Sequence, residues 1–381
     1  MVAGVVASVV GFTSSFAVVL AGLTAVGAAP DEAASGLLVL TATMGLGTIA
    51  LSWSTRTPVL LAWSTPGAAL LAGATVPDGG YADAVGAFVV AGLLYLLTAL
   101  VRPVGEAVAR IPASLANAML AGVLLVLCVE PFRALADEPA AVAPVLVTWL
   151  VLLRVARRWA VPGAFAAALV VVVATGAASS VDASDLVPHL TWTAPHLDPL
   201  TVLAIGVPLY LVTMTSQNIP GVAVLASFGY QAPLRPALAY AGVATTLTAG
   251  LGAYSINLAA ISAALAAGPT SHDDPARRWV AGVATGVTNL VLAPLAAAVV
   301  TVAAAAPAGV IAAVAGVALL GTLGSAAAAA LAEERDREAA TLTFVVAASG
   351  MTIGGIGAAF WALVAGGVFL VVVRGRRVPW R

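Results

Sequence analysis

Charged residues are scarce in this sequence, cysteine occurs once, and lysine is absent. Only 9% of the 381 residues are charged, whereas a soluble globular domain carries roughly 25%, so this composition cannot build a water-facing surface. The formal net charge of −1, without a basic patch, excludes nucleic-acid binding. One cysteine, Cys128, excludes an intramolecular disulfide and a cysteine-based zinc site.

Hydrophobic residues dominate instead. They make up 61% of the chain, and the mean hydropathy is +1.07. We therefore interpret the protein as polytopic, with many helices in the lipid bilayer. Neither a polar extension nor a small-residue cleavage site precedes the first apolar run, so we interpret this run as a membrane span rather than a signal peptide. We expect no metal and no cofactor.

Breaks at charges, prolines and glycine-rich turns divide the chain into fourteen candidate spans, because a helix needs about 20 apolar residues to cross the hydrocarbon core. The first seven are Val2–Val26, Ala33–Trp53, Pro58–Ala74, Tyr81–Val101, Ile111–Val129, Val142–Val155 and Pro162–Ala178. After a polar stretch, the second seven are Leu200–Ile219, Pro236–Gly252, Ser255–Ala267, Trp279–Val302, Gly309–Ala330, Ala339–Met351 and Ile353–Val373. The predicted fold class is an all-α polytopic membrane protein.

The arginines give an independent test of this count, since short cytoplasmic loops collect basic residues. With the N-terminus inside, 15 of the 16 arginines fall on the cytoplasmic side, and only Arg133 lies outside. We therefore predict that both termini are cytoplasmic.

The third segment of each half carries a related sequence. Ala62–Gly73 and Asn257–Gly268 both end in Ala-Ala-Leu-x-Ala-Gly, and both lie in segments too short to cross as full helices. Because seven spans bring the second half into the membrane from the opposite side, the repeat is predicted to be inverted. We place the first repeat at residues 1–180, an extracytoplasmic linker at 181–199 and the second repeat at 200–381.

Each of these two short segments is predicted to begin extended and to become helical half-way. Pro58 disfavours helix at the residue before it, and Ser64-Thr65-Pro66 has the hydroxyl cap and early proline of a helix start. In the second half we expect an extended stretch at 253–256, with Asn257 as the cap. Two half-helix N-termini that face each other form an anion site, because free N–H groups and positive dipole ends meet there.

The polar residues at membrane depth are neutral. One cluster is Thr13-Ser14-Ser15, and the other contains the adjacent amides Gln217 and Asn218. Amides in an apolar span are expensive unless they are partnered, so we interpret them as lining a site, with interhelical packing as the alternative. For the hydroxyl cluster, bonding back to its own helix is an equal alternative.

Aromatic and histidine residues are less specific signals. Phe12, Phe16, Trp63, Tyr210 and Tyr254 flank the polar clusters, although aromatic residues in spans are more often packing or interface residues. We interpret His189 and His196 as solvated loop residues. His272, in a Ser-His-Asp-Asp turn, stays a candidate for proton coupling beside the same loop interpretation. Gly282 and Gly286 have the GxxxG spacing of close helix packing.

Three motifs resemble the benzoate:proton symporter (BenE) family: Thr213–Gly221 (Thr-Met-Thr-Ser-Gln-Asn-Ile-Pro-Gly), Ile256–Ile261 and His272–Arg278. The resemblance implies uptake of benzoate with a proton as the coupling ion across the bacterial inner membrane. It also implies the fourteen-span architecture of the uracil and xanthine transporters and sulfate permeases. There, a core of spans 1–4 (about 1–101) and 8–11 (about 200–302) moves against a gate of spans 5–7 (about 110–178) and 12–14 (about 309–373). A homodimer is plausible by analogy.

The sequence differs from the nucleobase transporters of that fold at two informative positions. They carry carboxylates around the positions of Gln217 and Ile256, to accept protons of the ring N–H groups. The neutral residues here favour a carboxylate substrate over a nucleobase, because fixed carboxylates repel an anion. They also leave the proton carrier unidentified.

These observations predict a carrier in which the substrate carboxylate lies between the two half-helix starts and the ring lies against aromatic side chains. The candidate substrate-binding residues are Phe12, Thr13, Ser14, Ser15, Trp63, Ser64, Thr65, Thr213, Gln217, Asn218, Tyr254, Ile256, Asn257 and Leu258. The alternatives are a carrier of another small anion, such as sulfate, or of a nucleobase. A channel lacks support because no charged rings are present. An enzyme lacks support because no catalytic cluster lies at membrane depth.

Overall fold

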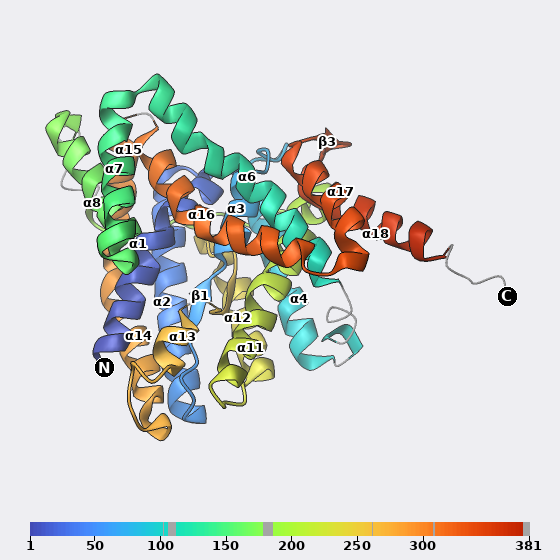
Figure 1. Cartoon of the computed structure of the whole chain (residues 1–381), viewed down its shortest axis with the longest axis horizontal. Coiled ribbons are helices and arrows are strands. Elements are labelled where there is room, and N and C mark those ends of the chain that lie inside the picture. The colour runs from blue at the N-terminus through green and yellow to red at the C-terminus, as the bar shows by residue number, and fades with distance from the viewer. Residues whose placement is uncertain (102, 106–111, 178–185, 261, 308, 376–381) are drawn as a thin grey trace.

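The computed structural model describes residues 1–101, 103–105, 112–177, 186–260, 262–307 and 309–375. Five helices run without a break: α1 (Val2–Ala25), α2 (Pro30–Thr55), α4 (Tyr81–Leu100), α6 (Ala113–Asp137) and α16 (Val310–Leu331). Shorter helices are α3 (Thr65–Ala72), α7 (Pro139–Val155), α8 (Ala160–Ala174), α12 (Leu234–Thr248), α13 (Ala263–Ala267), α14 (Trp279–Leu292), α15 (Ala296–Ala305), α17 (Arg337–Ala348) and α18 (Ala358–Gly375). Figure 1 shows their arrangement.

Eight helical stretches in the described part of the chain are long and apolar enough to cross a membrane. The count of fourteen spans stays a prediction. Several predicted ends are wrong, among them those of the fifth and the last span. Helix α6 continues to Asp137 instead of ending near residue 129, and it contains Pro131. The last helix begins at Ala358, because Gly354 and Gly355 at positive φ turn a short hairpin of β3 (Thr352–Ile353) and β4 (Ile356–Gly357) just before it.

The predicted eighth span is one continuous helical stretch from Pro199 to Ser227, which ends eight residues later than expected. It consists of α9 (Pro199–Thr201), a π turn η4 (Val202–Gly206), α10 (Val207–Thr213), a second π turn η5 (Met214–Asn218) and α11 (Ile219–Ser227). Each π turn is followed within two residues by a proline, Pro208 or Pro220. A proline ring clashes with the carbonyl four residues earlier, and the wider π turn relieves that clash, so the helix continues instead of ending.

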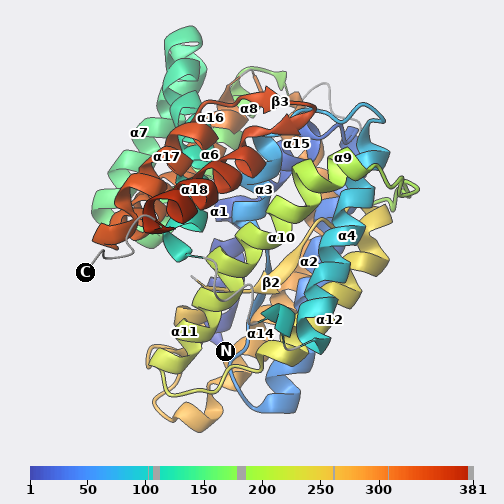
Figure 2. The ribbon, with the colours of Figure 1, turned by 90° about the vertical axis from the view of Figure 1, so that its right-hand side faces the viewer.

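The helices form two groups, which Figures 1 and 2 show from two directions. In one group, α6 packs on α16 and α17, α17 packs on α18, and α7 packs on α8. In the other group, α2 packs on α14, α4 packs on α12, and α1 packs on α3 and α14. Helix α1 also contacts α16, and α3 contacts α6, so these contacts join the two groups.

Glycine allows the closest helix contacts in the second group. A Cβ atom on Gly286 of α14 would lie 2.6 Å from the carbonyl oxygen of Gly45 on α2, and one on Gly242 of α12 would lie 2.8 Å from that of Gly92 on α4. The predicted close packing at Gly282 and Gly286 is confirmed, since a Cβ atom on either would meet α2. Such contacts bring backbones together without side chains between them.

Two three-residue strands lie side by side in the middle of the molecule. Strand β1 (Leu61–Trp63) pairs antiparallel with β2 (Ile256–Leu258), with Ala62 opposite Asn257. A strand pair this short leaves outward N–H groups that lipid cannot satisfy. Side chains from neighbouring helices accept them: Thr48 Oγ1 from Leu61 (2.9 Å), Asn218 Oδ1 from Leu258 (3.0 Å) and Thr245 Oγ1 from Ile256 (3.3 Å). Side chains of neighbouring helices therefore satisfy these three N–H groups of the strand pair.

Candidate substrate site

A cavity of about 190 Å³ lies beside the paired strands β1 and β2. It is bounded by the first half of α1, the start of α3, the segment that leads into α13, and one side each of α14 and α16. Its polar lining residues are Ser8, Ser14, Ser15, Thr65, Gln217, Ser262, Thr285, Asn289 and Thr322. No acidic, basic or histidine side chain is among the described residues that line it.

The N-terminus of α3 reaches this cavity and is built as the sequence predicts. Ser64 is the N-cap, and its Oγ accepts from the Gly67 N–H at 3.0 Å. The same Oγ lies 2.6 Å from Thr213 Oγ1 of α10, which ties the cap to the neighbouring helix. Pro66 has no N–H, and the N–H of Gly67 is already bonded to Ser64. The Thr65 N–H is therefore the one left unbonded in this first turn, and Thr65 lines the cavity.

The second half-helix differs from the expectation. The extended stretch continues through Asn257 to Leu258, and α13 begins only at Ala263, with Ser262 as its N-cap. Asn257 is therefore a strand residue and not a helix cap, because its pairing with Ala62 keeps it extended. Ala259, Ala260 and Ser262, which lead into α13, line the same cavity as Thr65. The two half-helix starts thus border one cavity, with the strand pair between them.

Aromatic rings form one wall of the cavity. The rings of Phe12 and Trp63 both line it, with centroids 5.6 Å apart and planes tilted by 56°. The Trp63 indole N–H donates to Ser15 Oγ at 3.0 Å, and Ser15 in turn donates to the Gly11 carbonyl at 2.8 Å. Behind Phe12, Phe16 is fully buried. This chain of contacts fixes the indole plane at the edge of the cavity.

The two adjacent amides of η5 have different surroundings. Asn218 faces the strands: its Oδ1 accepts from the Leu258 N–H, and its Nδ2 lies 3.4 Å from Met214 Sδ. Gln217 lines the cavity and is 8% exposed. Within the part of the chain that the structure describes, the Gln217 amide has no hydrogen-bond partner. Gln217 therefore has its full donor and acceptor capacity available in the cavity.

The structure separates the fourteen predicted site residues into two sets. Six line the cavity: Phe12, Ser14, Ser15, Trp63, Thr65 and Gln217. The other eight do not, and are Thr13, Ser64, Thr213, Asn218, Tyr254, Ile256, Asn257 and Leu258. Thr13 donates back to the Val9 carbonyl at 2.7 Å, and Tyr254 donates to the Ser64 carbonyl at 2.8 Å. Most of the second set hold the cap and the strands in place.

Sequence reasoning missed the residues that α14 and α16 contribute. Thr285 and Asn289 of α14 and Thr322 of α16 line the cavity, as do Ser8 of α1 and Ser262. For Asn289 a signal was present, because an amide inside an apolar span is as expensive there as at Gln217. For the hydroxyl residues no such signal exists, since serine and threonine satisfy themselves within a helix.

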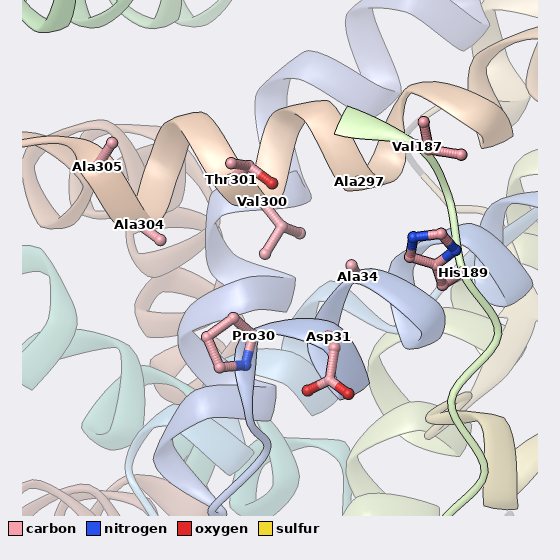
Figure 3. Close-up of a pocket in the computed structure, with 10 residues that line it drawn as sticks. All are labelled: Pro30, Asp31, Ala34, Val187, His189, Ala297, Val300, Thr301, Ala304 and Ala305. Atoms are coloured by element: carbon pink, nitrogen blue, oxygen red, sulfur yellow. The ribbon is translucent and has the colours of Figure 1, made fainter. Parts of the chain in front are cut away.

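A second cavity, of about 500 Å³, lies where residues 187–189 pass the N-terminal end of α2 and helix α15. Figure 3 shows Asp31 and His189 on its walls, with Val300 and Ala304 opposite. The Asp31 carboxylate opposes the binding of an anion here. We therefore do not place the substrate in this cavity.

The three histidines lie outside the substrate cavity. His196 is more than a solvated loop residue: its Nδ1 lies 2.5 Å from the buried Asp83 carboxylate, although the ring is 70% exposed. His272 is exposed, and its Nδ1 accepts from the Asp274 N–H at 3.0 Å, which closes the loop before α14. Neither ring reaches the substrate cavity.

Known proteins match the whole chain. Residues 1–372 match the family described as benzoate membrane transport protein, BenE. The chain is 37% identical to the inner membrane protein YdcO of Escherichia coli over 377 residues, which are 98% of this chain and 95% of YdcO. It is 28% identical to the benzoate membrane transport protein of Acinetobacter baylyi over 318 residues, 84% of this chain and 80% of that protein.

Solved structures share the fold. The transmembrane domain of the cyanobacterial bicarbonate transporter BicA gives a TM-score of 0.61 at 13% identity, over 96% of this chain and 97% of that one. The murine Solute Carrier 26 family member A9 anion transporter, in the inward-facing state, gives 0.63 at 11% identity, over 100% of this chain and 69% of that one. The family resemblance predicted from three motifs is confirmed. The chain belongs to the benzoate membrane transport family, BenE, a family of multi-pass membrane transporters.

Proposed function

We propose that this protein is a secondary transporter that takes up benzoate, or a similar small aromatic carboxylate, together with a proton. The observation that carries the proposal is the cavity beside the paired strands β1 and β2, which combines an aromatic wall with neutral hydrogen-bond donors. Its acid-free lining among the described residues suits an anion. The match to the benzoate transport family and the similarity to the Acinetobacter baylyi protein support the choice of substrate class.

The size of the cavity supports a substrate with one ring. An apolar cavity of about 150 Å³ is large enough to bind benzene, whereas drug-sized ligands occupy pockets of roughly 300–1,000 Å³. At about 190 Å³, this cavity matches a phenyl ring with one small polar group. Burial of that ring against Phe12 and Trp63 contributes roughly 2 kcal/mol.

The carboxylate is proposed to lie near the start of α3. The Thr65 N–H and the positive end of the helix dipole favour a negative charge there, by up to about 2 kcal/mol in a partly buried site. The free amide of Gln217, on the π turn η5, adds a side-chain donor. An inorganic anion such as sulfate would use these donors too, but it would leave the aromatic wall without a partner.

We further propose that transport proceeds by alternating access between two inverted repeats, residues 1–180 and 200–381. The strand register supports this symmetry. In the sequence alignment Ala62 corresponds to Asn257, and in the structure these residues stand opposite each other, as a two-fold axis between repeats requires. The contact of α2 with α14 likewise corresponds to that of α12 with α4.

The two helix groups are proposed as the moving parts. The group that contains α1, α2, α4, α12 and α14 carries the strands and most of the cavity, and corresponds to the core. The group around α6 and α16 corresponds to the gate and contributes Ala318 and Thr322. We propose the inner membrane as the location, both termini on the cytoplasmic side, and a homodimer as the assembly.

The direct test is uptake of radiolabelled benzoate into proteoliposomes that contain the purified protein. We expect uptake that increases when the outside is made acidic relative to the inside, and that unlabelled benzoate inhibits. Uracil, sulfate and bicarbonate in excess serve as competitors. Uptake of uracil that benzoate leaves unaffected would contradict the proposal, and so would benzoate uptake that is blocked equally by sulfate. Uptake without any response to the pH gradient would remove the proton from the mechanism.

A further inference from the structure

The cavity contains a second free amide, on a helix that none of the predicted site residues occupies. Asn289 of α14 lines the cavity and is 3% exposed. The Ser8 hydroxyl of α1 donates to the side-chain oxygen Oδ1 of Asn289. The amide nitrogen Nδ2 has no acceptor among the described residues. Ser8 therefore occupies the acceptor atom of Asn289 and leaves the donor atom over.

A buried amide in this state is unusual, because buried polar atoms are nearly always hydrogen-bonded. The described side-chain atoms that are enclosed without any partner belong to Tyr81, Ser216, Thr246 and Asn257. Asn289 Nδ2 is not one of these, so its surface is open to the cavity rather than sealed in protein. A donor that is oriented and left free at a cavity wall is arranged for an acceptor on a ligand.

The position of Asn289 relative to the aromatic wall fits one molecule of the proposed substrate. Ser8 and Phe12 lie four residues apart on α1, so they share one face and are separated by about 6 Å along the helix axis. A ring held against Phe12 and Trp63 thus lies about one helical turn from the Ser8–Asn289 pair. Because Thr65 and Asn289 line the same cavity of about 190 Å³, a carboxylate near the start of α3 and the Asn289 amide share that cavity.

We propose that Asn289, oriented by Ser8, donates a hydrogen bond to the substrate carboxylate and makes the site prefer a carboxylate over its neutral amide. This inference rests on the proposed function, and it assigns a specificity-determining residue to α14. An amide oriented by a hydroxyl offers a donor and withholds its acceptor. A substrate with an N–H group at that position therefore meets a donor where it needs an acceptor, and binds less well.

The experiment measures the affinity of the purified protein for labelled benzoate and, by competition, for benzamide, which has the same size without the charge. We expect the wild type to prefer benzoate. Asn289→Leu is expected to weaken benzoate binding at least tenfold and benzamide binding by a smaller factor, because the neutral carbonyl of benzamide accepts a weaker hydrogen bond than a carboxylate does. Asn289→Asp, which replaces the donor by an acceptor, is expected to weaken benzoate and to strengthen benzamide at pH 7.5.

Two further variants complete the test. Ser8→Ala removes the group that orients the amide, so it is expected to reduce the preference for benzoate severalfold, and an unchanged preference would contradict the role of Ser8. Asn117→Leu on α6 is the matched control, because the Asn117 amide donates to the Ala113 carbonyl away from the cavity. The selectivity ratio distinguishes binding from structure, since a purely structural defect lowers both affinities together.

The outcomes separate this inference from the proposed function. A wild type that binds benzoate, with Asn289→Leu and Asn289→Asp at wild-type affinity and selectivity, overturns the role of Asn289 alone. A wild type that binds neither benzoate nor any other aromatic carboxylate overturns the proposed function, and this inference with it.

Discussion

The Leu258 N–H donates to the Asn218 side-chain oxygen over 3.0 Å, and this bond fastens strand β2 to the π turn η5. Leu258 is 1% exposed and Asn218 is also 1% exposed, so no water is available to replace the bond. Asn218 was predicted as a substrate residue because of its polarity at membrane depth. In the structure the Asn218 side chain is instead bonded to the backbone, through the Leu258 N–H.

Replacement of Asn218 by alanine is therefore expected to destabilise the protein by about 1–3 kcal/mol, because the buried Leu258 N–H loses its acceptor. Asn257→Ala is the informative comparison. It removes one hydrogen bond, from Asn257 Nδ2 to the Leu258 carbonyl, but it also removes Asn257 Oδ1, which is buried without a partner. We expect Asn257→Ala to be nearly neutral. Thermal stability in detergent checks both variants, and equal destabilisation would contradict this account.

The close contact of α2 with α14 is expected to tolerate no side chain at Gly286. A Cβ atom there would lie 2.6 Å from the Gly45 carbonyl oxygen, so Gly286→Ala must push the two backbones apart. Overpacking of this kind typically destabilises by about 1–3 kcal/mol. Gly321→Ala on α16 is the matched control. A Cβ atom at Gly321 meets open space, and alanine is favoured over glycine in a helix by roughly 1 kcal/mol. Opposite changes in melting temperature are the expected result.

The segment 186–198 is held against the helix ends by several side chains, and the buried Asp83 is one of them. Asp83 accepts from the Gly79 N–H at 2.9 Å, and its carboxylate also contacts the ring of His196. The backbone N–H of His196 donates to the Ala82 carbonyl at 3.0 Å. Asp83→Ala is expected to increase hydrogen exchange at the start of α4, around residues 79–83, and to destabilise the protein by about 1–3 kcal/mol, since the Gly79 N–H loses its acceptor.

His196→Ala serves as the comparison for that segment, with the exposed Asp78→Ala as the control. The His196 ring is 70% exposed, and exposed pairs contribute roughly 0–1 kcal/mol, so the change in exchange should be much smaller. If His196→Ala increased exchange as much as Asp83→Ala, the contact with the ring and not the hydrogen bond from Gly79 would account for the effect.

The sequence predicted one half-helix more accurately than the other, for a local reason. Ser64, Thr65 and Pro66 form a cap and first turn through contacts between neighbours in the chain, and such contacts are readable from sequence. The fate of Asn257 depends on Ala62, nearly 200 residues away, which holds it in a strand. An asparagine before an alanine-rich run resembles a helix cap until that pairing is known.

The same limit applies to the cavity. Phe12, Trp63 and Gln217 were predicted because each stands out in its own segment. Asn289 acquires its significance from Ser8, 281 positions away in the chain, because the serine decides which end of the amide is free. A proline gave the opposite error at the end of the eighth span. The predicted span stops at Ile219, before Pro220, yet the π turn before this proline carries the helix on to Ser227.

Trp63 is expected to contribute to affinity through its ring rather than through its N–H group. Trp63→Ala removes one side of the aromatic wall, and the loss of roughly 1.5–3 kcal/mol of apolar burial corresponds to about a tenfold or greater loss of benzoate affinity. Trp63→Phe keeps a ring and loses the bond to Ser15, so a change below threefold is expected. The partly exposed Trp159→Ala, outside the cavity, controls for a general effect of tryptophan loss. An equal loss in both Trp63 variants would show that the Ser15 bond matters more than the ring.

Gln217→Glu places a carboxylate in the cavity where the structure has an unpartnered neutral amide. At pH 7.5 the ionised glutamate repels the substrate carboxylate, and we expect benzoate affinity to fall at least tenfold. The control is Gln231→Glu in the exposed loop before α12, which should bind as wild type. Competition binding at pH 7.5 is the measurement, and a Gln217→Glu protein with unchanged affinity would show that Gln217 does not contact the substrate.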